Sequence, residues 1–342
     1  MHMQPLLITT SLFLNQMMYL ECMNIALLGY GKTGKVFHAL LNENVTVFDP
    51  LHGDVKKRIE NVKKEELKDF DFVVNLLPSR YNELVLNLIK NLEVNYMDFS
   101  TFRTDKPEQL DFKENFKNRL ALLNVGIAPG LDNLLVAEIA DNANWIKIFL
   151  LEHQYSLFYP SWSVEDMMLT LEDKPLIYKK GKFITVDNFS DPEVKSCSSG
   201  CFWFYRFFGE EILSLALNVP NLNIELKAGG SEIEVAKFIY SLKKSGGGIK
   251  FGDKKIDEEG VFGILIESDY KNVEVMFPKT SEIKKRFRIG NHITFPTALM
   301  GTLFLKHAKE LKGMYFPEEL PEDIRKKILN DVKKYTTVFK FY

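Results

Sequence analysis

The chain has 342 residues and a mass of 39.5 kDa, which at about 150 residues per domain predicts two domains with sizeable cores. Hydrophobic residues make up 46% of the chain and charged residues 26%, so the composition excludes a disordered protein. Lys and Arg number 44 against 46 Asp and Glu, a net charge of -2. A protein that binds the nucleic-acid backbone needs a basic excess, so we expect no nucleic-acid partner.

The chain contains three cysteines, Cys22, Cys197 and Cys201. An odd number of cysteines without a convincing export signal favours a reducing compartment, so we expect a cytoplasmic protein. No second pair of Cys or His with ligand spacing accompanies Cys197 and Cys201. The sequence therefore predicts no metal site.

Residues 1–22 precede the first predicted strand and contain an apolar run over residues 5–14. This run is too short to span a bilayer, includes Thr and Ser, and follows no Lys or Arg. We therefore expect neither a signal peptide nor a membrane contact, and we interpret residues 1–22 as a non-structural extension.

From Met23 to about residue 145, short apolar strands alternate with helix-like stretches. Strands that are apolar on both faces and separated by helices indicate a parallel, doubly wound sheet. The sequence therefore predicts an α/β fold with an N-terminal Rossmann domain over residues 23–145. The predicted strands cover residues 24–28, 45–48, 72–77, 96–99 and 121–125, and the predicted helices cover residues 33–41, 65–70, 81–90 and 107–118.

Later strands follow one another with few helices between them, which is typical of a mixed or antiparallel sheet. We expect a second, α+β domain over residues 146–292 that binds substrate and forms the dimer contact. Residues 293–342 are expected to form helices that pack back on the domains. The predicted strands cover residues 145–154, 183–186, 223–227, 262–268 and 273–277, and the late helices cover residues 296–311 and 321–335.

The first predicted strand is followed by the motif G-x-G-x-x-G and the start of a helix. In this motif the first glycine permits a tight turn, the second lets the backbone approach a pyrophosphate, and the third lets helix and strand pack closely. These roles fall to Gly29, Gly31 and Gly34. The loop residues Tyr30, Lys32 and Thr33 are expected to contact the cofactor as well.

The same segment fits most of the phosphate loop G-x-x-x-x-G-K of nucleotide triphosphatases, through Gly29, Gly34 and Lys35. The next residue is Val36, where that loop has a Ser or Thr whose hydroxyl binds magnesium. The missing hydroxyl favours a dinucleotide over a nucleoside triphosphate.

Asp49 ends the second predicted strand at the place where an acidic side chain accepts hydrogen bonds from the adenosine ribose. The alternative is a solvated turn residue before Pro50. No Arg or Lys occurs among residues 50–53 to bind a 2′-phosphate, so the sequence favours NAD, with NADP as the second choice.

Ligands in such sheets bind beyond the carboxyl ends of the strands. Three loops at those ends are expected to line the path from adenosine to nicotinamide, with contacts from Leu76, Leu77, Pro78, Ser100 and Ile127. Asp98 ends the fourth strand. It is either a catalytic carboxylate or a cap for a neighbouring turn.

Three segments resemble the saccharopine dehydrogenase (glutamate-forming) and lysine 6-dehydrogenase family: residues 124–133, 160–166 and 313–320. The resemblance implies a dinucleotide-binding domain and a second domain that contacts substrate. It also implies reversible oxidation of a carbon–nitrogen bond of an amino acid with NAD or NADP. The resemblance extends from residue 23 to about residue 330, with the segments in the same order along the chain.

The chain departs from the family at three places. Ala128 stands where saccharopine-forming members tend to carry Asp, which is more similar to lysine 6-dehydrogenase. Residues 152–154 read Glu-His-Gln where the family has Cys-Gly-Gly or Gly-Gly. In the segment that resembles Leu-Arg-Trp-Pro-Gly-His, Lys227 keeps the positive charge and Ser231 replaces the imidazole. Fold and cofactor therefore carry over more safely than substrate.

Oxidation of an amine carbon requires a base with a pKa near neutrality and cations for the substrate carboxylates. His153, at the end of a predicted strand, is the preferred base, and a packed or surface histidine is the alternative. Lys227, Arg80 and Arg206 are the candidate carboxylate ligands, with surface ion pairs as the alternative. Trp162 is expected to form a wall of the substrate pocket or to be a core anchor.

The sequence predicts an NAD(P)-dependent oxidoreductase that acts on the CH–NH group of a lysine-related amino acid or an opine-like conjugate, working as a homodimer. One alternative is a dinucleotide-binding redox sensor without catalysis, suggested by the altered residues 152–154 and Ser231. A carboxyspermidine-type reductase is the other alternative.

Overall fold

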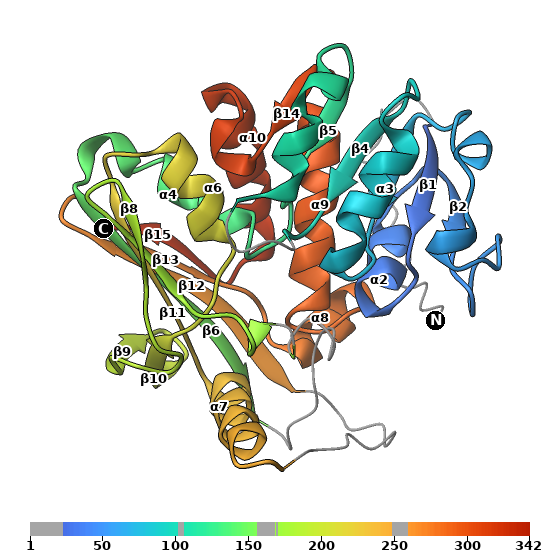
Figure 1. Cartoon of the computed structure of the whole chain (residues 1–342). Coiled ribbons are helices and arrows are strands. Elements are labelled where there is room, and N and C mark those ends of the chain that lie inside the picture. The colour runs from blue at the N-terminus through green and yellow to red at the C-terminus, as the bar shows by residue number, and fades with distance from the viewer. Residues whose placement is uncertain (1–22, 102–105, 156–167, 169, 248–258) are drawn as a thin grey trace, which may run out of the picture.

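The computed structural model describes residues 23–101, 106–155, 168, 170–247 and 259–342 (Figure 1). Two β-sheets lie on either side of helix α9 (Thr294–Ala308). Two predictions concern residues outside the described ranges: the non-structural extension over residues 1–22 and the place of Trp162 in the substrate pocket or core. Both stay predictions.

The first sheet has six parallel strands in the order β14-β5-β4-β3-β1-β2. Ile25 and Leu27 of β1 enter one core cluster and Ala26 and Leu28 enter another, so both faces of the sheet are buried. This confirms the predicted doubly wound sheet. Its strands are β1 (Asn24–Leu28), β2 (Asn44–Phe48), β3 (Phe72–Asn75), β4 (Asn95–Asp98), β5 (Leu120–Leu122) and β14 (Gly313–Tyr315).

Helices α2 (Lys32–Leu40) and α3 (Asn82–Ile89) cover this sheet as predicted. Two other predicted helices are wrong in type. Residues 65–70 contain only the 3-10 turn η2 (Lys64–Glu66), and residues 107–118 form the 3-10 helix η4 (Glu108–Phe116). In η4 the buried Gln109 donates to the Asp98 carboxylate and to the Ser100 carbonyl, so tertiary hydrogen bonds override the helical pattern.

The C-terminal segment contributes strands as well as helices. Besides α9 and α10 (Glu322–Val332), it adds β14 to the first sheet and β15 (Val338–Phe341) to the second. Both strands have at most four residues, too few to show a periodic pattern. Each sheet thus contains a strand that lies after the predicted boundary at residue 292. The domain boundaries given above stay predictions.

The second sheet has nine strands, seven of them in the order β15-β13-β12-β6-β11-β10-β9, with β7 pairing β11 and β8 pairing β7. Only β6 and β11 pair in parallel, so the sheet is mixed, as expected. The strands are β6 (Trp145–Gln154), β7 (Leu176–Lys179), β8 (Lys182–Thr185), β9 (Glu193–Cys197), β10 (Gly200–Arg206), β11 (Asn223–Gly229), β12 (Gly260–Ser268) and β13 (Val273–Met276).

One face of the second sheet packs on helices, and its other face is partly covered by the β9–β10 hairpin. Ile148 and Ile264 face the helix side and share a core cluster with Leu299 of α9. On the other face, Ser198 at the hairpin tip donates its backbone N–H to Glu274 of β13 at 2.7 Å. The sheet therefore curls toward a half-barrel, with α6 (Glu211–Asn218), α7 (Ser231–Lys244), α8 (Thr280–Phe287) and α4 (Leu131–Ala137) on or near the helix side.

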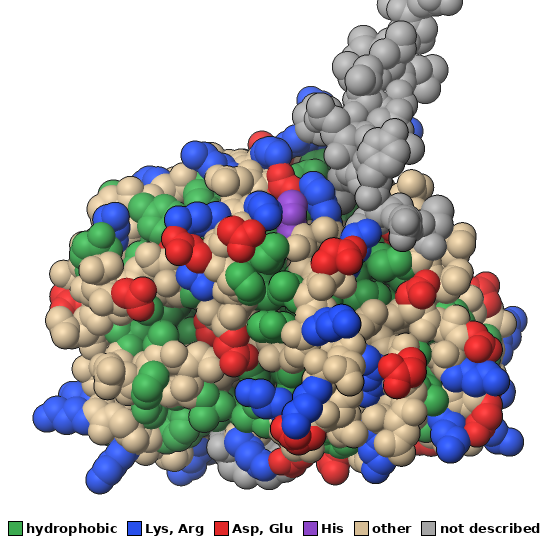
Figure 2. Space-filling model, turned by 90° about the horizontal axis from the view of Figure 1, so that it is seen from above, with side chains coloured by type: hydrophobic (Ala, Val, Ile, Leu, Met, Phe, Trp, Pro, Cys, Tyr) green, Lys and Arg blue, Asp and Glu red, His purple; other side chains and the backbone are tan. Residues whose placement is uncertain are grey.

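On the face drawn in Figure 2, Lys and Arg side chains are interspersed with Asp and Glu, so that no large region carries charge of one sign. No helix in the described ranges is long and apolar enough to cross a bilayer. The same ranges contain no group of three or more His, Cys, Asp or Glu side chains suited to a metal ion.

Candidate active site

The glycine loop between β1 and α2 has the geometry that its sequence motif requires. Gly29 has φ of +93°, and a Cβ there would lie 2.9 Å from the Leu76 carbonyl oxygen. A Cβ on Gly34 would lie 2.5 Å from the Gly29 carbonyl oxygen. Glycine is therefore needed at both positions, once for backbone conformation and once for the close approach of α2 to β1.

Gly31 differs from the other two glycines, because a Cβ there would meet nothing within 4 Å. Its φ of -71° is open to any residue. Gly31 is also the N-cap of α2, and no described side chain caps the helix there, nor does an acidic residue occupy its first turn. The free space beside uncapped N–H groups fits a pyrophosphate, the anion that this motif holds.

Asp49 sits directly after β2 and contacts the glycine loop. Its Oδ2 accepts a hydrogen bond from Tyr30 N at 3.1 Å, and its Oδ1 accepts from Leu51 N and His52 N at 2.9 Å. Burial alone would raise the pKa of Asp49, but these hydrogen bonds outweigh it and lower the pKa. Asp49 is therefore an anion at the tip of β2 that also orders the turn after it.

The loop after β3 lies against the glycine loop through the contact of Gly29 with Leu76. Leu77 N donates to the Asn75 side chain, and Pro78 leads into the 3-10 turn η3 (Ser79–Tyr81). The first sheet reverses strand order between β1 and β3, the place where doubly wound sheets bind ligands.

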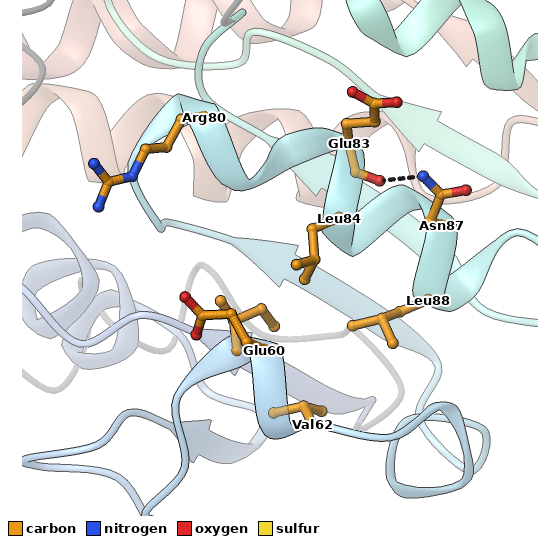
Figure 3. A pocket seen from close by; sticks show the side chains of 8 residues that line it. Glu60, Val62, Arg80, Glu83, Leu84, Asn87 and Leu88 are labelled. Carbon is orange, nitrogen blue, oxygen red and sulfur yellow. Dashed lines mark hydrogen bonds between the residues drawn. The ribbon is translucent and has the colours of Figure 1, made fainter.

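Arg80 lies on this loop, on the first domain rather than near the second sheet. Its guanidinium stacks on the Tyr81 ring at 4.8 Å. It also borders a surface hollow between α3 and the 3-10 turn η1 (Ile59–Asn61), where Leu84 and Leu88 lie opposite Glu60 and Val62 (Figure 3). This position is on the side of β2 and Asp49, so Arg80 is not used in the proposed substrate site, and its predicted role as a carboxylate ligand stays a prediction.

Asp98 is fully buried beneath the loops after β4 and β5. Its carboxyl group accepts hydrogen bonds from Asn124 N at 2.8 Å and from Gln109 Nε2 at 3.0 Å. Burial in this environment raises the pKa of Asp98 to about 7. The geometry is that of the capping alternative, in which Asp98 positions neighbouring loops, and a direct catalytic role would require a path to substrate.

The loop after β5 turns sharply between Gly126 and Gly130. Gly130 has φ of +139°, and a Cβ there would lie 2.0 Å from the Gly126 carbonyl oxygen. A Cβ on Gly126 would lie 3.5 Å from Thr297 in the first turns of α9. Ser100 and the buried Ile127 follow β4 and β5 at the carboxyl edge of the first sheet, the edge that also carries the glycine loop and the loop after β3.

His153 lies near the end of β6, half-buried between the rings of Tyr155 and Phe202. Its Nδ1 accepts a hydrogen bond from Ser231 N at 3.3 Å. In a neutral ring this places the proton on Nε2, which is then a donor and not a base. Burial and the neighbouring His292 lower the pKa of His153. The base predicted from sequence is therefore in the wrong tautomer for that role in this structure.

Lys227 and Arg206 are opposite each other on β11 and β10, and both are engaged by acidic side chains. The fully buried Lys227 ammonium binds Asp191 at 2.7 Å and Glu193 at 2.5 Å, and Arg206 binds Glu225 at 2.7 Å. The proposed substrate site therefore omits both cations. In the β11–β6 pairing, Lys227 lies opposite Phe149 of β6. Phe149 is four residues before His153, so the two positions are about 13 Å apart along β6.

Sequence reasoning missed a buried polar group where α7, α8 and α9 begin. The fully buried His292 ring joins Thr280 Oγ1 at 2.9 Å to Glu232 Oε1 at 2.9 Å. Gln154 also donates to Glu232, at 3.1 Å. The only signal in the sequence is a histidine next to the Asn291 cap of α9, and its partners are distant in the chain.

Sequence reasoning also missed the contacts made by the first residues of α6. Glu210 accepts a hydrogen bond from Thr101 N in the loop after β4. Glu211 contacts Asp132, directly after the Gly126–Gly130 turn. Two acidic residues before an apolar helical run are typical of a solvated helix start, so the pattern gave no reason to bury them.

Comparison with known proteins adds evidence on the fold. No protein-family model matches the chain, and no curated protein matches it. Among solved structures it is similar to saccharopine dehydrogenase (L-Glu forming) from Saccharomyces cerevisiae, with 13% identity, a TM-score of 0.66, and coverage of 94% of this chain and 99% of that one. The chain has the fold of this saccharopine dehydrogenase. The resemblance seen in the sequence is thus confirmed at the level of the fold.

Two further structures are more distant. Dihydrodipicolinate reductase from Paenisporosarcina sp. TG-14 is 15% identical with a TM-score of 0.40, and the match covers 88% of this chain and 100% of that one. Aspartate dehydrogenase from Thermotoga maritima is also 15% identical with a TM-score of 0.40, over 84% and 98% of the two chains.

Substitutions at Gly31 and Gly34 should distinguish a glycine needed for cofactor binding from a glycine needed for packing of the fold. Gly34→Ala places a methyl group against the Gly29 carbonyl and should cost about 1–3 kcal/mol of folding free energy. Gly31→Ala should leave the melting temperature unchanged and weaken NAD affinity about tenfold or more, because its methyl group enters the space for the pyrophosphate. Thermal melting and NADH fluorescence titration measure the two effects. Unchanged affinity in Gly31→Ala would contradict the pyrophosphate position.

Lys227→Met should destabilise the fold rather than a ligand complex. Removing the ammonium leaves Glu193 and Asp191 facing a buried apolar side chain, at a cost of about 2 kcal/mol because both carboxylates are partly exposed. Urea unfolding should give a lower midpoint with an unchanged slope. A variant as stable as the parent but with weaker amino-acid binding would restore Lys227 to the substrate site.

Proposed function

We propose that this protein is an NAD-dependent oxidoreductase that acts on the CH–NH group of an amino acid. The uncapped start of α2 beside Gly31 carries the proposal, because protein packing does not require glycine there and a pyrophosphate does. When bound, NAD would supply the hydride acceptor. The fold shared with a saccharopine dehydrogenase supports the reaction class.

Each part of the cofactor has proposed contacts along one edge of the first sheet. The N–H groups of Lys32, Thr33 and Gly34 would bind the pyrophosphate, and Asp49 would accept hydrogen bonds from the adenosine ribose. The loop after β3 and Arg80 would face the adenosine. Ser100 and Ile127 would lie toward the nicotinamide.

The preference for NAD over NADP rests on the charge of Asp49. Its lowered pKa keeps the carboxylate ionised at neutral pH, where it would repel a 2′-phosphate. Oδ1 already accepts two hydrogen bonds, from Leu51 N and His52 N, but Oδ2 accepts only one, from Tyr30 N, and keeps capacity for a ribose hydroxyl.

The substrate would bind between this edge and the second sheet, near His153. A neutral histidine with its proton on Nε2 is a hydrogen-bond donor, which would bind an acceptor atom of the substrate such as a carboxylate oxygen. We also propose that the protein acts in the cytoplasm as a homodimer. The edge strand β9 supports the dimer, because Val194 and Trp203 are exposed on its hairpin.

A dinucleotide-binding sensor without catalysis is the second candidate. It is favoured by one observation, that Asp98, Lys227 and Arg206 all have partners within the protein. Such a protein would bind NAD with no turnover.

A substrate panel tests the proposed function. NADH formation should appear with NAD and one of lysine, saccharopine or carboxyspermidine, and it should be lost in Gly31→Val, which blocks the pyrophosphate space. Tight NAD binding with no turnover of any compound would favour the sensor. No binding of NAD or NADP by the folded chain would contradict the cofactor assignment itself.

Asp49→Ser should change cofactor choice. Loss of the charge removes ribose hydrogen bonds, which should weaken NAD binding by about 1.5–3 kcal/mol, and it also removes repulsion of the 2′-phosphate. The ratio of NAD to NADP affinity should therefore fall at least tenfold in titrations at fixed salt. Asp54→Ser, which removes a nearby carboxylate bonded to Val47 N, is the matched control. An unchanged ratio would place Asp49 in an ordinary turn.

A further inference from the structure

We propose that Asp132 and Glu211 share one proton, and that this buried pair positions the Gly126–Gly130 turn at the nicotinamide end of the site. Asp132 belongs to α4, which directly follows that turn, and Glu211 begins α6 beside the second sheet. Only the consequence for the cofactor rests on the proposed function. The shared proton rests on the geometry of the two carboxyl groups.

Both carboxyl groups are withdrawn from solvent, with Asp132 0% and Glu211 2% exposed. Asp132 Oδ1 accepts hydrogen bonds from Gly130 N and Asn133 N, each at 2.9 Å. The remaining oxygens, Asp132 Oδ2 and Glu211 Oε2, are buried and accept no hydrogen bond from a donor among the described residues. The two carboxyl groups are neighbours, close enough that each shifts the pKa of the other.

Two ionised carboxylates in such a contact would repel each other in a medium of low dielectric, so one of them must be protonated. Burial and the neighbouring Glu211 raise the pKa of Asp132 well above its ordinary value. Burial also raises the pKa of Glu211, while hydrogen bonding from Asp132 opposes the rise. The proton therefore belongs on Asp132 Oδ2, which donates to Glu211, whose charge lies at the positive end of α6.

The surrounding elements supply no compensating cation in the part of the chain that the structure describes. From α6 comes Glu210, which binds Thr101 N, and from the turn after β14 comes the buried Glu318, bound by Asn133 Nδ2 at 2.9 Å. The Arg325 ion pair with Glu138 is at the other end of α4. No cation among the described residues is thus recorded beside the pair, which strengthens the need for the shared proton.

The pair connects the two sides of the proposed site. Asp132 holds the N–H of Gly130, the residue whose φ of +139° makes the turn possible. Glu211 fixes Asp132 from the second sheet's side, and Ser214, one turn later in α6, meets Asn133 Nδ2 at 3.1 Å. Glu211 is therefore a positioning residue. Loss of the proton would push Asp132 and Glu211 apart. The Gly126–Gly130 turn, which carries Ile127 at the nicotinamide end of the proposed site, would then loosen.

The sign of the pH dependence follows from linkage. The pKa of Asp132 is higher in the folded chain than in the unfolded chain, so the folded state binds more protons at neutral pH. The contribution of the pair to stability is complete below the unfolded pKa and is lost as pH rises through the folded pKa. Melting temperature should therefore decline as pH rises above the unfolded pKa, until the pair has lost its proton.

Melting temperature between pH 6 and pH 9 tests the shared proton in the full chain. Asp132→Asn supplies an N–H donor where the acid carries its proton, and Glu211→Gln supplies one from the other side. Each should flatten the pH dependence, by about 2 °C or more for each unit of pKa shift that is removed. Glu322→Gln, a substitution of the same type at an exposed ion pair with Lys326, is the matched control and should keep the parent's slope.

Parallel curves for the parent and for whichever of the two variants folds would overturn the shared proton. Failure of both variants to fold at pH 6, where the parent pair is protonated, would overturn it as well, since both variants keep a donor in the contact. A flattened curve in either folded variant supports it.

NADH affinity over the same pH range tests the positioning role separately. The parent should bind NADH more weakly as pH rises, with a change of at least threefold, and Asp132→Asn should not. If the melting curves behave as expected and NADH binds with the same pH dependence in both proteins, the pair does not position the turn. If NADH binds to neither protein at any pH, the proposed function fails while the shared proton stands.

Discussion

Backbone groups at the carboxyl ends of β4 and β5 leave the sheet and need hydrogen-bond partners inside the protein. The Asp98 carboxyl group is one of these partners, because it accepts a hydrogen bond from Asn124 N after β5, and it also accepts one from the Gln109 side chain in η4. Gln109 and Asn82 in turn donate to the Ser100 carbonyl after β4. The loops that would face the nicotinamide thus rest on buried side chains rather than on solvent. A site built in this way is rigid, as the proposed hydride transfer would require.

The second sheet depends on the same edge, since its helices reach across to the loops of the first. Glu210 and Glu211 of α6 contact the loops after β4 and β5, and α9 contacts Gly126 through Thr297. Because β14 is parallel to β5, the helix that leads into it must begin at the carboxyl edge. The residues before α9, including His292, are therefore brought to the site by topology alone.

The glycine loop and strands β1 to β5 of the first sheet could be predicted from sequence because their requirements are local. Gly29 and Gly34 are required by steric contacts within the loop itself. Buried strands such as β3 can be recognised as continuous apolar runs. The cation assignments could not be made in the same way. Lys227 points to the face of β11 opposite Leu226, and only the curl of the distant β9–β10 hairpin brings Glu193 against it. Strand alternation predicts a face, but not what covers that face.

The buried acids near the cofactor edge bear on how the site tolerates an anionic ligand. Asp98 has a pKa raised to about 7, and Asp132 is also shifted toward its neutral form, so this side of the site carries less negative charge than its composition suggests. A pyrophosphate bound at α2 would favour the protonated acids further by charge repulsion, in addition to the burial that is the main cause of their raised pKa. Linkage is reciprocal, so protonation of these acids would in turn favour the cofactor. Burial of these acids with no cation recorded beside them among the described residues is costly for the fold, and the proposed binding of an anion at this edge would offset part of that cost by favouring their neutral forms.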